Sequence, residues 1–446
     1  MVMKLSKQIF SFIKYVQPGW YFLLPAFEGS CYWVDVQKLT VEDCSKIDLD
    51  YGYRQRESML RDAAYQLLLK GFISADKNLS LILTDGTIPI ADEYRFLRRH
   101  YHAWWSWYVF VLRCFTFHNP VQEFRGFMQA RRVKRLALYA QVYSHVVREN
   151  LETLPLVSVI IPTLNRYEHL RNILHDLELQ THQNFEVIVI DQSSPYRPDF
   201  YLDFKLKLKV IRQDEPGLWK ARNRGVVESR AAWIAFSEDD VRVKEDWLLH
   251  HLACVFHFGV EISAGIFFPE GTTMPVHRSN YRWAEQFASG NALVNRSVFE
   301  RVGLFDLQFE RMRMGDGEFG LRAYLAGVKS ISNPKAYALD VKAPVGGLRQ
   351  MGSWDGFRPT NWFGPRPIPS VLYLTRRYFG NKLSILDLLV KVPPSIIPFR
   401  FKRRPVLLLL ASFLSTLIFP LILFQVFQSW RKASKMIEEG PKISNL

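Results

Sequence analysis

Two long apolar runs, each ending in polar residues, constrain the fold of this 446-residue chain more than any other feature. Residues 156–165 read LVSVIIPTLN, and residues 185–194 read FEVIVIDQSS. Such continuous runs of Val and Ile are typical of central strands in a parallel sheet, because those strands are buried on both faces. The segment between them, YEHLRNILHDLELQ, repeats its apolar residues at helical spacing. The sequence therefore predicts a strand–helix–strand unit over residues 156–194.

The same alternation continues with a short strand LKVIRQ, a helix GLWKARNRGVVES and a strand AAWIAF. Strands that alternate with helices indicate an α/β domain with a largely parallel sheet. Ligands of such sheets bind beyond the carboxyl ends of the strands. Asp191 and the acidic run at residues 238–240 both follow predicted strands directly. We therefore expect the functional site at this edge of the sheet.

The acidic run Glu238, Asp239 and Asp240 needs compensation, because adjacent like charges repel. Solvent on a turn, basic neighbours or a bound cation could each supply it. Mg²⁺ and Mn²⁺ are commonly held by one or two carboxylates together with substrate phosphates. The residues alone leave two interpretations open, a metal site and a solvated acidic turn.

Other positions carry further chemistry, each with a simpler alternative. Asp191 could accept hydrogen bonds from a base or a ribose, or could form a turn beside Ser and Pro. Arg222 lies near the start of a predicted helix, a place that favours phosphate groups, although helix surfaces often carry such charges. Asp316 and Glu318 open a later helix, where a carboxylate could act as a general base or could simply stabilise the helix N-terminus.

Six motifs together resemble one family. VSVIIPTLNR, VIVIDQSS, ARNRG, IAFSEDDV, GN and GDGEF occur in the order and spacing of family 2 glycosyltransferases, over roughly residues 156–345. The resemblance implies a GT-A fold, that is, a Rossmann-like α/β domain with a mostly parallel sheet flanked by helices. It also implies an inverting, metal-dependent transfer of a sugar from a nucleotide-diphosphate donor, with Mn²⁺ or Mg²⁺ as the cofactor.

The resemblance assigns a role to each motif residue. It implies nucleotide-sugar binding by Pro162, Thr163, Asn165, Arg166, Asp191, Arg222, Asn223 and Asp239. It implies sugar or acceptor contacts by Gly290, Asn291 and Glu318, and metal binding by Glu238, Asp240 and Asp340. Asp316 would be the catalytic base that deprotonates the acceptor hydroxyl for in-line attack on the anomeric carbon.

The chain departs from the usual family pattern in several places. DQSS stands where the second strand usually ends in two Asp and a Gly, and Glu238 stands where Asp is common. Gly315 precedes Asp316 where many relatives have Glu, and Asp340 replaces a His that binds metal in some relatives. These changes concern donor choice and metal affinity more than the fold. They keep open an alternative function as a catalytically inactive membrane scaffold or a glycan-binding subunit.

A sugar nucleotidyltransferase is a second enzyme class with a related architecture. Such an enzyme needs a glycine-rich phosphate loop after its first strand, whereas this chain has PTLNRYEHL there. The sequence therefore favours the glycosyltransferase.

The region before the predicted sheet divides into two parts. Residues 1–97 predict a small α+β module, with a helix that ends at Gly71, a probable hairpin over residues 75–89 and a faint winged-helix pattern. Docking of a protein partner is a hypothesis for this module. Residues 98–155 form a linker whose aromatic run at 98–115 suits either a buried helix or an interfacial membrane segment, followed by a helix from residue 131.

The region after the predicted sheet points to a membrane. Residues 346–404 predict a loop and amphipathic helices, and residues 405–430 carry no charge over a length that could span a bilayer. Pro420 predicts a kink or break, so that a transmembrane and a monotopic segment are both open. Basic residues on both sides of this segment, including the tail at 431–446, leave its orientation undetermined.

The formal net charge of +15 indicates an anionic partner. The basic clusters are scattered and no nucleic-acid recognition motif accompanies them, so we expect no nucleic acid. A nucleotide sugar, an anionic membrane and a glycan or lipid-linked acceptor account for the charge. The four widely spaced Cys predict free thiols, and the basic N-terminus lacks a cleavage site. We therefore expect the protein at the cytoplasmic face of the cell membrane, in the synthesis of a cell-envelope polysaccharide or glycolipid.

Overall fold

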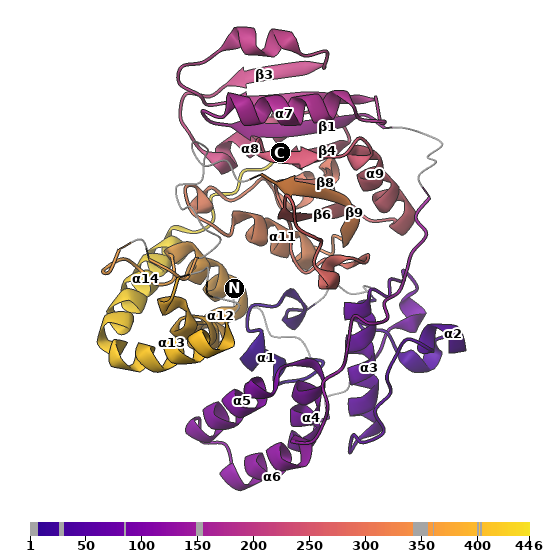
Figure 1. Ribbon diagram of the computed structural model, residues 1–446, viewed down its shortest axis with the longest axis vertical. Coiled ribbons are helices and arrows are strands. Elements are labelled where there is room, and N and C mark those ends of the chain that lie inside the picture. The colour runs from indigo at the N-terminus through magenta and orange to yellow at the C-terminus, as the bar shows by residue number, and fades with distance from the viewer. Residues whose placement is uncertain are drawn as a thin grey trace. The chain divides into compact units, whose positions relative to one another are not determined.

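The computed structural model describes residues 8–25, 31–83, 86–148, 155–341, 356–359, 361–398, 401 and 404–446 (Figure 1). The chain divides into two compact units. One unit comprises Met1–Ser144 and Thr375–Pro394, and the other comprises His145–Leu374 and Ser395–Leu446. The second unit contains the predicted sheet.

One half of the sheet consists of the four strands that the apolar runs predict. They are β1 (Val157–Thr163), β2 (Phe185–Asp191), β3 (Leu208–Arg212) and β4 (Trp233–Ser237). They are parallel and lie in the order β3-β2-β1-β4. Every residue of β1 is buried, as the continuous apolar run predicts. The α/β fold is thus confirmed.

The other half of the sheet is mixed. Its strands are β5 (Val241–Val243), β6 (Ile262–Pro269), β7 (Arg282–Trp283), β8 (Asn291–Asn295) and β9 (Ser330–Asp340). β8 runs antiparallel to both β4 and β6, whereas β6 and β9 are parallel. Because Ser237 pairs with Asn291, the start of β8 lies at the same edge as the carboxyl end of β4. The two halves therefore meet where the acidic run begins.

Helices flank this sheet (Figure 1). They are α7 (Tyr167–Glu178), α8 (Leu218–Glu228), α9 (Trp247–Phe258), α10 (Arg296–Val302) and α11 (Gly315–Leu325). α8 packs closely on β1, because a Cβ at Gly225 would lie 2.5 Å from a methyl carbon of Ile160. This close packing positions the start of α8 near the carboxyl ends of the strands.

The first unit is helical in its described residues. Its main helices are α3 (Arg56–Lys70), α4 (Ile90–His100), α5 (Ala103–Phe115) and α6 (Pro120–Ala130), with short helices α1 (Ile13–Val16) and α2 (Val41–Cys44). α3 ends at Gly71 in the left-handed conformation (φ 84°), as predicted.

The predicted α+β character and the winged-helix hairpin of this unit are wrong for the part of the chain that is described. Residues 31–83 and 86–97 contain no strand, only an isolated bridge between Val34 and Ser80. Lys77–Leu79 form a 3₁₀-helix instead, capped by the Asp76 carboxylate, which accepts from the Asn78 amide. Lys38 also donates to the carbonyl of Asn78. Side-chain hydrogen bonds, one from the adjacent Asp76 and one from the distant Lys38, thus take backbone groups that a hairpin would need.

The helix predicted from residue 131 does not form, and residues 131–148 run without helix or strand. The amide of Leu136 donates to the carbonyl of Arg99, and the amide of Tyr143 donates to that of Lys70. Both carbonyls lie in the last turn of a helix, where no intrahelical donor is available. Pairing with these helix ends therefore replaces the local helix.

The C-terminal region contains α12 (Pro369–Lys391), which kinks at Gly380, followed by α13 (Pro405–Leu417) and α14 (Phe419–Glu439). α13 and α14 bend by 89° just before Pro420, so the predicted break is confirmed. No single helix among the described residues is long and apolar enough to cross a membrane; only the bent pair together has that length and composition. Part of the predicted loop, residues 346–355 and 360, lies outside the described residues.

Candidate active site

Four predicted residues form one hydrogen-bonded group at the carboxyl ends of β1 and β4. The hydroxyl of Thr163 donates to Oδ2 of Asp239 (2.8 Å). Nη1 of Arg166 donates both to Oδ1 of Asp239 (3.2 Å) and to Oδ2 of Asp240 (2.9 Å). We call these four residues the carboxylate cluster. The strand pattern predicted that the acidic run lies at this edge, since parallel strands bring their carboxyl ends together, whereas Thr163 and Arg166 were assigned to the site only by the family resemblance.

Within the carboxylate cluster Thr163 and Asp239 are buried, whereas Arg166 and Asp240 are partly exposed, and burial changes the acidity of Asp239. Asp239 is 4% exposed, and burial raises its pKa to about 7, opposed by the attraction of Arg166 and assisted by the negative charge of Asp240. Glu238 is compensated separately, because its Oε1 lies 3.7 Å from Nη2 of Arg222. In this structure basic neighbours offset the acidic run.

The predicted metal ligands do not assemble into a site. The described part of the chain holds no group of three or more His, Cys, Asp or Glu side chains that could bind one ion. Asp340 ends β9 opposite Val241, but Arg166 holds Asp240, and Glu238 faces Arg222. The set of Glu238, Asp240 and Asp340 therefore does not fit a divalent cation as it stands. Arg166 occupies Oδ2 of Asp240 and would compete with a cation for that oxygen.

Asp191 is completely buried beneath the edge of the sheet. Its Oδ2 accepts hydrogen bonds from the hydroxyls of Tyr167 (2.8 Å) and Tyr201 (2.7 Å), and its Oδ1 accepts from the amide of Ser193 (2.8 Å). Burial, and then the hydrogen bond to Asp191, raise the pKa of both tyrosines. A carboxylate offers about four acceptor positions. Three are used here, so that at most one remains for a nucleotide base.

The unusual DQSS sequence has a structural role. The amide of Asn165 donates to Oγ of Ser193, and the amide of Ser194 donates to Oδ1 of Asn165, both at 2.8 Å. Asn165 adopts a left-handed conformation (φ 55°), which Asn tolerates better than most residues. Ser193 and Ser194 thus tie the loop after β2 to the loop after β1.

The N-terminus of α8 is occupied by a side chain of the protein itself. The carboxylate of Glu310 accepts from the amides of Leu218 (2.7 Å), Trp219 (3.0 Å) and Lys220 (3.0 Å). The residues alone leave phosphate binding and an ordinary helix surface both open at this position; in the structure described, Glu310 already satisfies those amides and the helix dipole.

The two predicted site residues of α8, Arg222 and Asn223, have different environments. The guanidinium of Arg222 lies over the ring of Trp219, 5.1 Å from its centroid. Asn223 forms a pair of hydrogen bonds with the backbone of Phe305, at 2.8 and 2.9 Å. Arg222 therefore adjoins the acidic run, whereas Asn223 fixes α8 to the segment before α11.

On the other side of the acidic run, Gly290 and Asn291 shape the site. A Cβ at Gly290 would lie 2.5 Å from Cγ of Glu238, so only glycine leaves room for that side chain. Oδ1 of Asn291 accepts from Trp247 and His251, and its Nδ2 donates to backbone carbonyls of β6 and β9. Burial lowers the pKa of His251 to about 3, so the ring is neutral and can donate from Nε2. Asn291 thus fastens β8 to its neighbours.

Asp316 and Glu318 lie in the first turn of α11 but differ in environment. Oδ1 of Asp316 accepts from the amide of Gly317 (2.8 Å), and the side chain is partly exposed. Glu318 is fully buried and forms two hydrogen bonds with Arg322, at 3.0 and 2.9 Å. The structure therefore does not bring Glu318 together with the other predicted residues.

Trp219 connects α11 to the acidic run. A Cβ at Gly315 would lie 2.5 Å from the Trp219 ring, which in turn lies beneath Arg222, the partner of Glu238. The start of α11, one residue before Asp316, thus packs against the ring that carries the guanidinium facing Glu238.

The comparisons with known proteins agree with this geometry. Residues 158–303 match the model of Glycosyl transferase family 2. This region belongs to that family. The matched region contains β1 from its second residue to β8, the helix α10 and every member of the carboxylate cluster. β9 lies beyond it.

Individual relatives of this family 2 domain are distant. Glycosyltransferase AglE of Haloferax volcanii is 28% identical over 163 residues, which cover 34% of this chain and 53% of AglE. The chain thus spans about half the length of that relative. The PGL/p-HBAD biosynthesis glycosyltransferase of Mycobacterium bovis is 25% identical over 190 residues, 38% of this chain and 70% of that protein.

A solved structure is also similar. The mannosyltransferase PcManGT of Pyrobaculum calidifontis, in complex with GDP-Man and Mn²⁺, is 14% identical and aligns over 64% of this chain and 87% of its own. The TM-score of 0.40 is too low to carry an argument about this chain.

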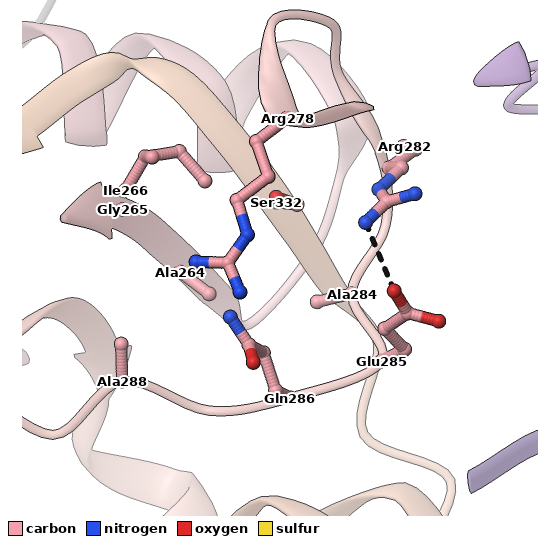
Figure 2. Close-up of a pocket in the computed structure, with 10 residues that line it drawn as sticks. All are labelled: Ala264, Gly265, Ile266, Arg278, Arg282, Ala284, Glu285, Gln286, Ala288 and Ser332. Atoms are coloured by element: carbon pink, nitrogen blue, oxygen red, sulfur yellow. Dashed lines mark hydrogen bonds and ion pairs between the residues drawn. The ribbon is translucent and has the colours of Figure 1, made fainter. Parts of the chain in front are cut away.

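The family 2 domain contains a pocket that the sequence analysis missed. It is lined by Ala264, Gly265, Ile266, Arg278, Arg282, Ala284, Glu285, Gln286, Ala288 and Ser332. Figure 2 shows Arg278 reaching across it towards Gln286, while Arg282 pairs with Glu285 (2.9 Å). Burial and the charge of Arg282 lower the pKa of Arg278. The segment VHRSNYRWAEQ, with its two Arg, was the available signal.

This pocket adjoins the predicted acceptor residues. Ala264 pairs with Ala292 in the sheet, and a Cβ at Gly265 would lie 2.4 Å from Nδ2 of Asn291. Ala288 is two residues before Gly290. The pocket therefore lies on the β6–β8 side of the acidic run and carries a net positive charge.

Proposed function

We propose that this protein is an inverting glycosyltransferase that moves a sugar from a nucleotide-diphosphate donor to a glycan or lipid-linked acceptor, in the synthesis of a cell-envelope polysaccharide or glycolipid. The observation that carries this proposal is the carboxylate cluster at the ends of β1 and β4, within the family 2 domain. The relative from Mycobacterium bovis is itself named for a biosynthetic glycosyl transfer.

In the proposed reaction Asp316 is the general base. Its carboxylate takes the proton of the acceptor hydroxyl, whose oxygen forms a bond to the anomeric carbon. The bond from that carbon to the diphosphate oxygen breaks on the opposite face, which inverts the configuration. The leaving diphosphate carries the negative charge, and Arg166 and Arg222 are the guanidinium groups beside the acidic run that could stabilise it.

The proposed cofactor is a divalent cation, Mn²⁺ or Mg²⁺, but no step here depends on it, because its three proposed ligands are not assembled. The proposed acceptor site is the pocket at Arg278, next to Gly290 and Asn291. Its positive charge suits an acceptor with a phosphate or carboxylate group near the reacting hydroxyl.

We also propose that α13 and α14 attach the protein to the cytoplasmic face of the cell membrane. Both helices expose large apolar side chains, among them Val406, Phe413, Leu417, Phe419 and Phe427. The 89° bend between them favours monotopic insertion over a straight transmembrane span. The basic residues Arg431, Lys432 and Lys435 lie farther along α14, where they could contact anionic headgroups.

The test is calorimetric binding of UDP, GDP and dTDP to the detergent-purified protein, first with Mn²⁺ and then with EDTA. We expect one nucleotide to bind, and we expect Asp240→Asn to change that binding. Asp203→Asn is the matched control, because Asp203 forms a surface ion pair with Arg171. If no nucleotide binds under either condition, the inactive scaffold becomes the better function. The internal bonds of Asp191, Asp239 and Asp240 are the observation that favours that alternative.

A further inference from the structure

A helical hairpin in the first unit exposes an unusual number of aromatic side chains. It consists of α5, α6 and the loop between them, residues 103–130, and we call it the aromatic hairpin. Phe117 is 99% exposed, Phe115 is 79% exposed and Trp104 is 55% exposed. The other large exposed apolar side chains of the hairpin are Trp107, Val111, Val121 and Phe124.

The interior of the aromatic hairpin contains a buried ion pair. Arg113 is buried and donates to Glu123 (2.8 Å) and to the hydroxyl of Tyr15 (3.1 Å). The other oxygen of Glu123 accepts from the hydroxyl of Tyr94 (2.8 Å). Asn119 caps α6 by accepting from two of its first amides. The hairpin is therefore a well-specified structure, and its exposed rings are not the result of poor packing.

The exposed charged residues of the aromatic hairpin and of the chain that follows it, up to residue 148, are all basic. Residues 98–148 contain nine Lys and Arg but a single acid, Glu123, which is fully buried. The exposed basic residues in and just after α6 are Arg125, Arg131, Arg132, Lys134 and Arg135. An anionic lipid surface matches this one-sided charge, and its interface also accommodates the exposed rings of Trp104, Trp107 and Phe117.

We propose that the aromatic hairpin lies in the headgroup region of a bilayer that contains anionic lipids. Trp and Phe are favoured at membrane interfaces, and Lys and Arg beside them are attracted to anionic headgroups. α5 has 13 residues and is only about 20 Å long. A hydrocarbon core is about 30 Å thick. The hairpin therefore lies on the membrane and does not span it.

This contact is independent of glycosyl transfer and of α13 and α14. It uses different residues, in the other compact unit, and contains none of the predicted site residues. Its test must therefore report the local environment of the hairpin, because vesicle binding of the whole chain would not distinguish it from α13 and α14.

The experiment uses the full chain, reconstituted with vesicles of phosphatidylcholine and phosphatidylglycerol. An environment-sensitive fluorophore is attached to a Phe117→Cys variant, in a background of Cys44→Ser and Cys114→Ser, because the two other native thiols are buried. The matched control carries the label on Val41→Cys, which is 90% exposed in the same unit.

We expect the label on Phe117→Cys to shift to shorter wavelength on these vesicles and to be quenched by lipid-borne quenchers, while the control label does neither. Arg131→Gln combined with Arg132→Gln should reduce the shift at low salt. The proposal is overturned if both labels stay in an aqueous environment. It is equally overturned if the shift occurs without vesicles at high protein concentration, since a second copy of the chain would then cover the hairpin.

Discussion

The carboxylate cluster and the aromatic hairpin both reverse the usual distribution of side chains in a protein. In the cluster, Asp239 is buried and Asp240 is partly exposed, and both carboxylates pair with the guanidinium of Arg166. In the hairpin, large apolar rings are exposed, while the ion pair of Arg113 and Glu123 lies inside. Buried charge must be compensated within the protein. Exposed apolar surface can be compensated from outside, by a membrane or a partner.

The largest effect on activity is expected at Asp316. This carboxylate is proposed to take a proton from the substrate, whereas those of the cluster pair with Arg166. Asp316→Asn should lower the turnover rate about 10²–10⁴-fold, the usual contribution of a general base, and leave nucleotide affinity unchanged. Nucleotide release and calorimetric binding would measure the two quantities separately. Asp214→Asn, at an exposed ion pair with Arg212, is the control. Equal loss of binding and turnover would show that Asp316 has another role.

The ion pair inside the aromatic hairpin tests whether buried charge is compensated there as in the cluster. Glu123→Gln leaves Arg113 buried without a carboxylate and should lower the free energy of unfolding by about 3–5 kcal/mol. Urea denaturation would measure it. Replacing both partners, with Arg113→Met and Glu123→Leu, should restore much of that loss. A small effect of Glu123→Gln alone would mean that solvent reaches Arg113.

Replacing Arg166 tests whether its ion pair with Asp240 prevents the expected metal binding. Arg166→Ala removes the cation that holds Asp240, so Mn²⁺ binding to the nucleotide-free protein should strengthen, by about tenfold if the charge is partly screened. Electron paramagnetic resonance of free Mn²⁺ would measure the affinity. Arg171→Ala, at the surface ion pair with Asp203, is the control. Unchanged or weaker Mn²⁺ binding would show that Arg166 does not compete for the site.

His251 gives a pH dependence with a definite sign. Its folded-state pKa of about 3 is below the unfolded value near 6.5, so the unfolded state binds more protons between these pH values. Stability should therefore fall as the pH falls from about 6.5, by up to about 1.4 kcal/mol per pH unit from this group. His251→Gln should remove that part of the slope in denaturation series, whereas His257→Gln, at an exposed position, should not. An unchanged slope would contradict the assignment.

The residues that the sequence predicted well are those with local signals. β1, β2 and β4 follow from continuous apolar runs, and the edge positions of Asp191 and Asp239 follow from the strands. The sequence could not show which groups would meet these side chains. Glu310 caps α8 from about 90 residues away, and Tyr201 reaches Asp191 from the 3₁₀-helix Pro198–Asp203. Such contacts depend on tertiary packing, for which a single sequence carries no periodic signal.

Local patterns also failed where long-range pairing competed with them. Residues 131–148 have helical patterning but form neither helix nor strand, because the amides of Leu136 and Tyr143 satisfy carbonyls at the ends of α4 and α3. The aromatic run at 98–115 left a buried and an interfacial helix equally open. Composition could not decide between them, since the exposure of Trp104 and Phe115 depends on which face of α5 packs against α4 and α6.

The smallest effect is expected at the surface of the aromatic hairpin, and it completes the comparison. Trp104→Ser should change the free energy of unfolding by less than about 0.5 kcal/mol, because an exposed ring contributes little to the folded state. Phe127→Ala in the same hairpin should cost about 3–5 kcal/mol, since Phe127 is buried against Trp107 and Phe110. Urea denaturation in detergent-free and vesicle-bound samples would measure both. A large loss for Trp104→Ser in the absence of lipid would mean that another part of the protein covers this ring, and the exposed aromatic surface would then need no external partner.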